Sequence, residues 1–496
     1  MHAPSNRPAF GPHKLGVFEL SMINVAAIAT LRDLPAMAEY GLSAITYCLC
    51  VAVVFMIPIS LVSAELATGF PQAGGIYNWV RQAFGQRWGF VAIWLQWIQN
   101  VVWYPVVLSF AASTLAYALR PELAQNRYYI VGIVLASYWT STFVNFRGLK
   151  ASSRISTWGV LAGMLLPAAI LIGFGMAAWN SGTPRSDGSH LVFSLSALKP
   201  DLRHPSRMVL ALSMLLTSFV GMEMSASHAQ EVRNPQRDYP RAILIATLAI
   251  LALAIIGTMS LIVILPPDGI NAETGVMQTL QVLEHRYGLP GLIPASAVLI
   301  AFGLFGQVTT WVPGPSKGLL AVGRSGLLPR FFQITNGNGV QTHILIVQAG
   351  IVTVMALVFM VIPSVETAYT LLMATTAQLY LLMYILMFAA AIRLRYSQPD
   401  TPRAYRVPAG NVGMACVSGL GICGAIFAIA VFYLPQSGIS SLQWVALLLG
   451  SLVAMGCPPF IIYALRQPAW IAVRQGEAEN RGTENAETSQ EPVGSD

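Results

Sequence analysis

Residues 18–35 read FELSMINVAAIATLRDLP, and residues 215–228 read LLTSFVGMEMSASH. Both runs are apolar enough to lie in a bilayer, yet charged and small polar residues interrupt each of them. A bilayer offers backbone groups no hydrogen-bond partner, so a broken helix is expected only where it lines a cavity inside the protein. Interrupted segments at corresponding positions of two halves are typical of the binding site of a secondary transporter. The two runs open two halves of five expected helices each, beginning near residues 15 and 207, and predict such a site.

The composition of the whole chain indicates a membrane protein. Of its 496 residues, 55% are hydrophobic and only 10% are charged, and the mean hydropathy is +0.61. A soluble domain carries about a quarter charged residues. A single soluble core stops growing near about 250–300 residues, so a soluble protein of this composition would expose large apolar patches. We therefore expect an integral membrane protein.

Twelve windows are long and apolar enough for a bilayer helix, which needs about 20 residues. They are 15–38, 43–68, 88–118, 128–146, 154–179, 207–231, 240–265, 289–312, 341–362, 366–393, 413–435 and 441–465. We expect an all-α polytopic protein with 12 transmembrane helices and both termini on one side. Twenty of the 28 Lys and Arg residues lie in segments on that side, and the positive-inside rule makes it the cytoplasmic one. The predicted location is the cell inner (plasma) membrane, with cytoplasmic N- and C-termini.

The windows also predict how the chain is divided. The expected parts are a cytoplasmic N-terminal tail at 1–14, a ten-helix core at 15–395 with repeats at 15–179 and 207–395, helices 11 and 12 at 411–465, and a cytoplasmic tail at 466–496. The end of this last segment is rich in acidic residues and lacks aromatic ones. Such a composition cannot bury enough apolar surface to order itself, so a disordered acidic tail is expected.

Motifs for ATP hydrolysis and metal chemistry are absent from the sequence. No G-x-x-x-x-G-K-[ST] phosphate loop occurs, and the seven His residues are scattered without an H-E-x-x-H spacing. The five Cys residues lie inside apolar runs, a placement that favours neither a disulfide framework nor a metal site. Lys is nearly absent and Arg lies between apolar runs, unlike the basic face of a nucleic-acid binder. We expect no enzyme, no cofactor, no metal and no nucleic-acid partner.

Glu223 is the most informative single residue of the second run. An acid within a span is costly and is a functional hypothesis by default, with proton binding the obvious role. A structural alternative is that Glu223, which follows Gly221, complements the N-terminus of a second half-helix. Half-helix ends also suit an amino acid, because free N–H groups attract a carboxylate and unwound carbonyls attract an ammonium group.

Other charged residues lie near the ends of the spans. Arg32 and Asp33 are adjacent, so on a helix they would point about 100° apart and need not pair. We expect them at the outer rim, reaching toward water, rather than contacting a substrate. Glu19 lies near the cytoplasmic start of the first span and Glu65 near the cytoplasmic end of the second. Arg154 or Arg233 are plausible salt-bridge partners for an inner gate there, and the sequence does not decide which pairs form.

Three motifs carry a resemblance to a known family. They are ELATGFPQAGGIY at 65–77, GMEMSASHAQEVRNPQRDYPR at 221–241 and GPSKGLLAVGRSGLLP at 314–329. With these motifs the chain resembles the amino acid–polyamine–organocation transporter superfamily over about residues 14–465. The SASH and NPQRDYP runs, together with Trp311 before the third motif, are similar to the bacterial glutamate/GABA antiporter branch.

The resemblance implies a LeuT-type 5+5 inverted repeat with helices 1 and 6 broken, two further C-terminal helices, and alternating access. It implies exchange of an amino acid for its decarboxylation product or for another amino acid. By motif matching, the backbone of two triplets would contact the ammonium and carboxylate groups of the substrate. These are Ala27, Ile28 and Ala29 of the first span and Phe219, Val220 and Gly221 of the sixth.

The same resemblance implies roles for four side chains. Glu223 matches a glutamate linked to proton sensing, and Asn100 matches a polar residue of span 3 in arginine-exchanging relatives. Trp311 matches an aromatic gate residue, and Tyr380 matches a substrate-side tyrosine of the glutamate exchangers. The expected partners are an amino acid or its amine product and membrane lipid, with a homodimer as an option.

The chain departs from the branch at two places that bear on function. Arg32-Asp33 replaces the aromatic–acid pairing of the glutamate exchangers, and the short acidic tail replaces a longer basic plug. A proton-coupled symporter of amino acids or polyamines is an alternative within transport, and an obligatory requirement for a trans-substrate would separate an exchanger from it. A nutrient sensor that binds without transport is the alternative from another class, and the absence of a sizeable cytosolic domain argues against it.

Overall fold

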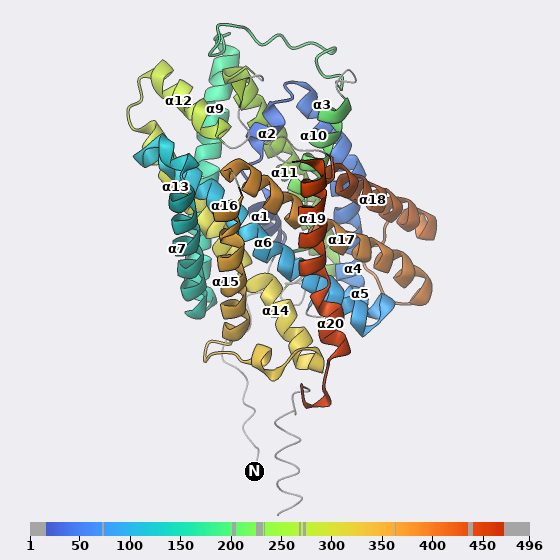
Figure 1. Ribbon diagram of the computed structural model, residues 1–496. Coiled ribbons are helices and arrows are strands. Elements are labelled where there is room, and N and C mark those ends of the chain that lie inside the picture. Colours follow the sequence, from blue (N-terminus) through green and yellow to red (C-terminus); the bar gives the residue numbers. More distant parts are fainter. Residues whose placement is uncertain are drawn as a thin grey trace, which may run out of the picture.

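The computed structural model describes residues 16–71, 74–200, 205–224, 232, 234–266, 269–270, 274–362, 364–434 and 440–470. The secondary-structure elements in these ranges are all helices (Figure 1). Within the described residues, ten helical segments are long and apolar enough to cross a membrane. The predicted all-α, multi-pass class is thereby confirmed.

The ten long segments carry most of the helices. They are α3–α4 (Ser43–Val51 and Ile57–Gly69), α6 (Gln86–Leu119), α7 (Arg127–Phe146), α8–α9 (Leu149–Trp158 and Leu166–Asn180), α11 (Pro235–Ile264), α13–α14 (Leu292–Trp311 and Pro313–Val322), α15–α16 (Thr342–Ala356 and Val358–Val361), α17 (Val365–Ser397), α18 (Gly410–Phe432) and α19–α20 (Ser441–Gly456 and Pro458–Ala464). Short π-helical turns join α3 to α4 and α8 to α9 and extend α14. Two shorter helices, α5 (Ile76–Phe84) and α12 (Gly275–Tyr287), connect the long ones.

Two further helices end inside the bundle. α1 (Val17–Ile28) ends before a non-helical stretch, after which α2 (Leu34–Ala38) begins. Pro35 fits the first turn of α2, and its ring and missing N–H disfavour an unbroken helix that continues from α1. α10 (Pro205–Ser218) ends shortly before Gly221, whose φ of +114° is readily accessible only to glycine. Both α1 and α10 therefore end within the interrupted runs singled out from the sequence.

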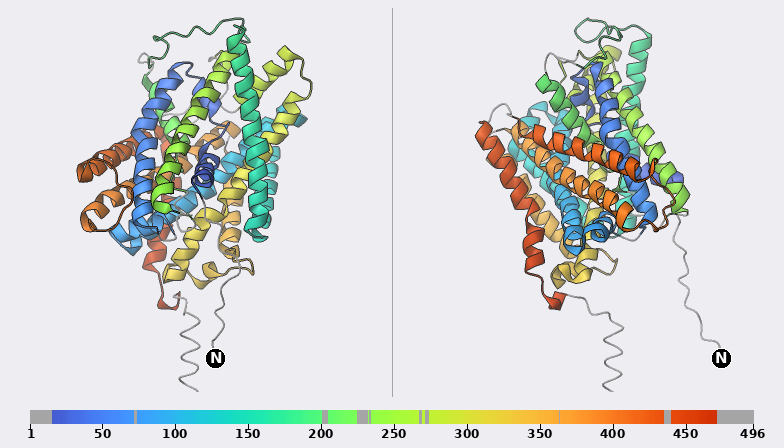
Figure 2. Two further views of the ribbon diagram at one scale, coloured as in Figure 1. Left: turned by 180° about the vertical axis from the view of Figure 1, so that it is seen from behind. Right: turned by 90° about the vertical axis from the view of Figure 1, so that its right-hand side faces the viewer.

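α6 and α17 form the centre of the bundle and pack against each other. In each of them, 78% of the most apolar stretch is buried, whereas the corresponding value for α19–α20 is 11%. Figures 1 and 2 show α6 and α17 running obliquely through the molecule, and the right-hand view of Figure 2 shows α19 and α20 along its edge. α1 lies within the bundle and packs against α11.

Glycines allow one pair of helices to touch backbone to backbone. Gly159 and Gly163, spaced G-x-x-x-G in the turn between α8 and α9, face Gly303 and Gly306 of α13. A Cβ atom added to Gly163 would lie 2.3 Å from the Cα atom of Gly303. Small residues at this spacing let membrane helices approach closely, so van der Waals contact stabilises this crossing.

A buried polar network joins α6, α7 and α15. The indole N–H of Trp97 donates to Gln348 Oε1 at 2.7 Å, and Gln348 Nε2 donates to the Tyr138 hydroxyl at 2.6 Å. All three residues are buried. Polar groups in an apolar interior must be paired, so this network fixes how the three helices pack.

Glu65 at the end of α4 is paired with arginines that the sequence did not single out. Its carboxylate accepts from Arg395 Nε at 2.5 Å and Arg395 Nη2 at 2.6 Å, and from the Val407 N–H at 2.7 Å. Arg403 Nε lies 3.5 Å away. Arg395 belongs to the last turns of α17, and the chain between α17 and α18 brings Arg403 and Val407 to Glu65. These contacts span more than 300 residues, and local spacing does not reveal them.

Candidate functional site

A cavity of about 70 Å³ lies where α1 and α10 end, bounded by α6, α13 and α17. A single water molecule needs a cavity volume of about 10–15 Å³, so this cavity has room for a small solute. Five residues predicted to bind substrate line it: Ile28, Asn100, Val220, Trp311 and Tyr380. The breaks in α1 and α10 thus border the cavity, as expected for unwound helices.

The other predicted backbone residues lie next to this cavity. Ala29 and Phe219 line a smaller adjoining pocket of about 20 Å³. Gly221 faces Ile28 and Trp311: an added Cβ atom would lie 3.2 Å from Ile28 Cγ1 and 3.7 Å from the Trp311 ring, and the φ of +114° disfavours any other residue here. Ala27 belongs to α1, and its side chain lies outside the described residues.

Glu223 is buried and makes three side-chain hydrogen bonds. The Tyr380 hydroxyl donates to Oε1 at 2.7 Å, and Gln96 Nε2 donates to the same oxygen at 3.2 Å. The Tyr384 hydroxyl donates to Oε2. Tyr380 also lines the cavity, so a single phenol connects the carboxylate to the space in which a solute would lie.

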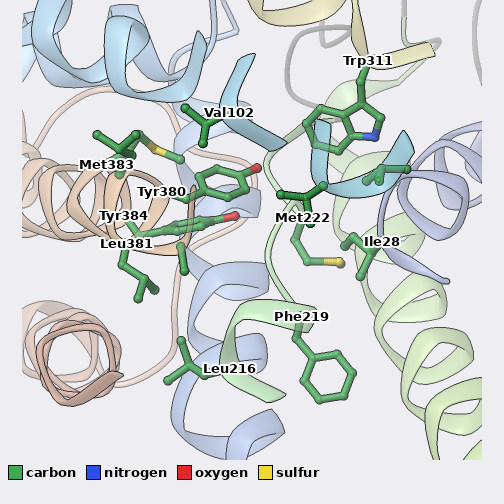
Figure 3. Packing of buried hydrophobic residues seen from close by; sticks show 14 of the residues in the cluster. Ile28, Val102, Leu216, Phe219, Met222, Trp311, Tyr380, Leu381, Met383 and Tyr384 are labelled. Atoms are coloured by element: carbon green, nitrogen blue, oxygen red, sulfur yellow. The ribbon is translucent and has the colours of Figure 1, made fainter. Parts of the chain in front are cut away.

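Tyr384 was not among the predicted site residues, although it links two of them. Its hydroxyl accepts the Gly221 N–H at 2.7 Å and donates to Glu223. It stacks on Tyr380 with ring centroids 5.0 Å apart. Figure 3 shows both rings pointing from α17 toward the segment that carries Met222. The two tyrosines are four residues apart in the sequence, a spacing that places both on one face of a helix and is the signal that points to Tyr384.

Aromatic rings form one wall of the cavity. Trp311 and Trp103 both line it, with ring centroids 5.7 Å apart. Among the described residues, neither the Trp311 indole nitrogen nor Thr376 Oγ1 has a hydrogen-bond partner, although both are buried and both residues line the cavity. Asn100 lies on α6, where its Nδ2 donates to the carbonyl of Gln96 at 2.8 Å. Buried polar atoms that lack partners are positions where a bound molecule gains hydrogen bonds.

The structure corrects the expectation for Arg32 and Asp33. Arg32 Nε donates to Asp33 Oδ1 at 2.8 Å, and the two side chains are only 10% and 9% exposed. Both line the cavity rather than the outer rim. The expectation placed Arg32 and Asp33 on a helix, where adjacent side chains diverge, but the chain is not helical between α1 and α2.

Comparison with known proteins identifies the family. The family model described as Amino acid permease matches residues 15–455, nearly the whole described chain. The chain belongs to the amino acid permease family. Members of this family are transporters, in agreement with the expectation that the permease is not an enzyme.

Several relatives align with the permease over most of their length. An uncharacterized transporter of Legionella pneumophila is 43% identical over 86% of this chain and 90% of its own. A glutamate/gamma-aminobutyrate antiporter of Lactococcus lactis is 30% identical over 91% of this chain and 90% of its own. A probable agmatine/putrescine antiporter of the same species is 22% identical over 80% and 83%. The similarity to antiporters agrees with the resemblance seen in the motifs.

Proposed function

We propose that the permease is a secondary active amino acid antiporter of glutamate/GABA type, working by alternating access in the inner membrane. The observation that carries the proposal is the cavity at the ends of α1 and α10, lined by residues of five different helices. The glutamate/gamma-aminobutyrate antiporter relatives supply the expected substrate class. The substrate pair is an amino acid and its decarboxylated amine, or two amino acids.

The site suits an ammonium group in particular. α1 ends at Ile28 and α10 ends at Ser218, both beside the cavity. The last carbonyls of a helix lack intrahelical partners and carry the negative end of its dipole. We assign the backbone of residues 27–29 and 219–221 to substrate contacts, and the side chains of Asn100, Trp311 and Tyr380 to its surroundings.

The proposed topology has twelve spans. Span 1 comprises α1 and α2, and span 6 begins with α10; together with the ten long segments they give the predicted number. The two repeats are residues 15–179 and 207–395, followed by spans 11 and 12 at 411–465. Segments 1–14 and 466–496 are assigned to the cytoplasm by the distribution of Lys and Arg.

We assign proton sensing to Glu223. Its contact with Tyr380 supports this role, because protonation of the carboxylate changes a hydrogen bond to a residue that lines the cavity. Glu223→Gln is expected to flatten the pH dependence of transport while the protein still inserts. The measurement is the initial rate of exchange in proteoliposomes from pH 4.5 to 8. A Glu223→Gln variant with the same pH dependence as the wild type would refute the assignment.

The deciding experiment for transport is uptake of labelled amino acids into proteoliposomes. Vesicles are prepared empty or preloaded with unlabelled amino acids or amines, at acidic and neutral pH. Uptake only into preloaded vesicles is the result expected of an antiporter, and it identifies the exchange pair. Uptake into empty vesicles driven by a proton gradient would make the permease a symporter, the alternative that the buried Glu223 beside the site favours.

A further inference from the structure

The cavity contains a guanidinium group that the backbone substrate contacts leave unused. We infer that the terminal nitrogens of Arg32 bind the distal carboxylate of a dicarboxylic amino acid, and the same carboxylate of its α-decarboxylation product. This inference rests on the proposed exchange function and names its substrate class. The carboxylate would lie at the end of the ligand opposite its ammonium group.

The hydrogen bonding of Arg32 leaves the two terminal nitrogens of its guanidinium group available to a ligand. Among the described residues, its side chain donates one hydrogen bond, from Nε to Asp33 at 2.8 Å. The two Nη groups, with four N–H bonds between them, donate to no group in that part of the chain. Because the side chain is only 10% exposed and lines the cavity, these donors have the cavity as their source of partners. A buried charged donor without its full set of partners is costly, so a bound anionic group would be strongly favoured.

Asp33 prepares Arg32 for this role. Its carboxylate holds Nε and leaves the outer edge of the guanidinium plane free, the edge that binds a carboxylate with two parallel hydrogen bonds. It also balances the charge of Arg32 when no substrate is present, so an empty site does not contain an isolated buried charge. The backbone N–H of Arg32 donates to Thr30 Oγ1 at 3.2 Å, which helps to order the junction between α1 and α2.

The chemistry of the exchange explains why this contact would matter. Removing the α-carboxylate of a dicarboxylic amino acid leaves its amine and its distal carboxylate, separated by the same carbon chain. An antiporter that exchanges the two molecules must bind both, and these are the two charged groups that they share. The carbonyl ends of α1 and α10 suit the ammonium group, and Arg32 suits the distal carboxylate.

The same geometry disfavours diamines and dibasic amino acids. Such a ligand would place a second cation in a cavity where Arg32 is already present and Asp33 is already paired. Like charges brought together in a poorly solvated site repel each other strongly. The permease is therefore expected to reject agmatine and putrescine, unlike the probable agmatine/putrescine antiporter among its relatives.

The test compares an acid with its neutral amide. Proteoliposomes with wild-type permease or Arg32→Met are preloaded with the unlabelled form of the compound being measured, and the half-saturating concentrations for glutamate, GABA and glutamine are determined. Loss of a charge-assisted contact is expected to weaken glutamate and GABA about 10- to 100-fold while leaving glutamine within about threefold. The matched control is Arg120→Met, which removes an exposed guanidinium at the end of α6 and should change none of the three values.

Two further measurements keep the inference testable if Arg32→Met does not fold. Arg32→Lys keeps the charge and the pairing with Asp33 but loses the planar fork, so it should reduce the preference for glutamate over glutamine. In the wild type, the γ-methyl ester of glutamate should compete at least about tenfold more weakly than glutamate.

The outcomes separate this inference from the proposed function. Exchange of amino acids by the wild type with an unaltered acid-to-amide preference in the Arg32 variants would overturn the role of Arg32 alone. A wild type that exchanges amides or diamines better than acids would overturn the substrate class. A wild type that exchanges none of the panel would overturn the proposed function itself.

Discussion

Replacing Glu65 with Gln is expected to destabilise the permease by breaking the ion-pair cluster between α4, α17 and the chain before α18. Glu65 is 1% exposed and receives hydrogen bonds from Arg395 and from the Val407 N–H, with Arg403 Nε 3.5 Å away. Gln offers one acceptor oxygen in place of two and turns an NH₂ group toward existing donors. Two guanidinium groups then lack a neutralising carboxylate, and breaking a buried pair costs about 3–5 kcal/mol.

The size of the shift in melting temperature follows from the length of the chain. Unfolding entropy is about 2.1 cal/mol/K per residue, or about 1 kcal/mol/K for the 496 residues if they unfold together. A loss of 3–5 kcal/mol therefore lowers the melting temperature by about 3–5 °C. Size-exclusion chromatography of heated, detergent-solubilised protein measures this shift. Glu366→Gln, which changes an exposed carboxylate at the start of α17, serves as the control and should shift it by less than about 1 °C.

A double-mutant cycle tests the cause of the loss. Arg395→Met should be destabilising in the wild type but should add little to Glu65→Gln, because its partner is already gone. Full additivity of the two changes, or a Glu65→Gln variant that melts with the wild type, would refute the reasoning from the ion pair.

Three further variants probe the packing and the site. Gly163→Val is expected to abolish stable expression, because its side chain would overlap the backbone of Gly303; a normal monodisperse elution profile would contradict this. Gln348→Leu removes the hydrogen bonds of the buried Trp97 indole N–H and Tyr138 hydroxyl to Gln348. Each loss is expected to lower the free energy of unfolding by about 1–3 kcal/mol, measured as a lower melting temperature. Tyr384→Phe removes the acceptor for the Gly221 N–H and is expected to reduce exchange rates by about tenfold or more with little change in expression, whereas an unaltered rate would show that this bond is dispensable.

Much of the fold follows from patterns within single segments. Ten of the twelve predicted windows contain helices long and apolar enough to cross a membrane, because the bilayer requires a run of apolar residues that can be recognised without knowledge of its neighbours. The two interrupted runs were also recognisable, since Pro35 and Gly221 act on the backbone locally. Glu223 was singled out because an acidic residue within a membrane span costs free energy and therefore indicates a functional role.

The pairings between segments could not be found in this way. Arg32 and Asp33 were expected at the rim because both were placed on a helix, whereas the chain between α1 and α2 is not helical and both side chains line the cavity. Tyr384 is one of many aromatic residues in the spans, and its contact with Glu223 joins positions 161 residues apart.

The amino-acid sequence alone therefore establishes that the permease is a multi-pass helical membrane protein, where its helices break, and which family it resembles. Each of these properties depends on composition or on neighbours a few residues away. The shape of the cavity, the partners of Glu223 and Glu65, and the position of the Arg32–Asp33 pair depend on how distant helices pack. A side chain in a low-dielectric interior must find its partner in three dimensions, and that partner is separated from it by up to several hundred residues of chain.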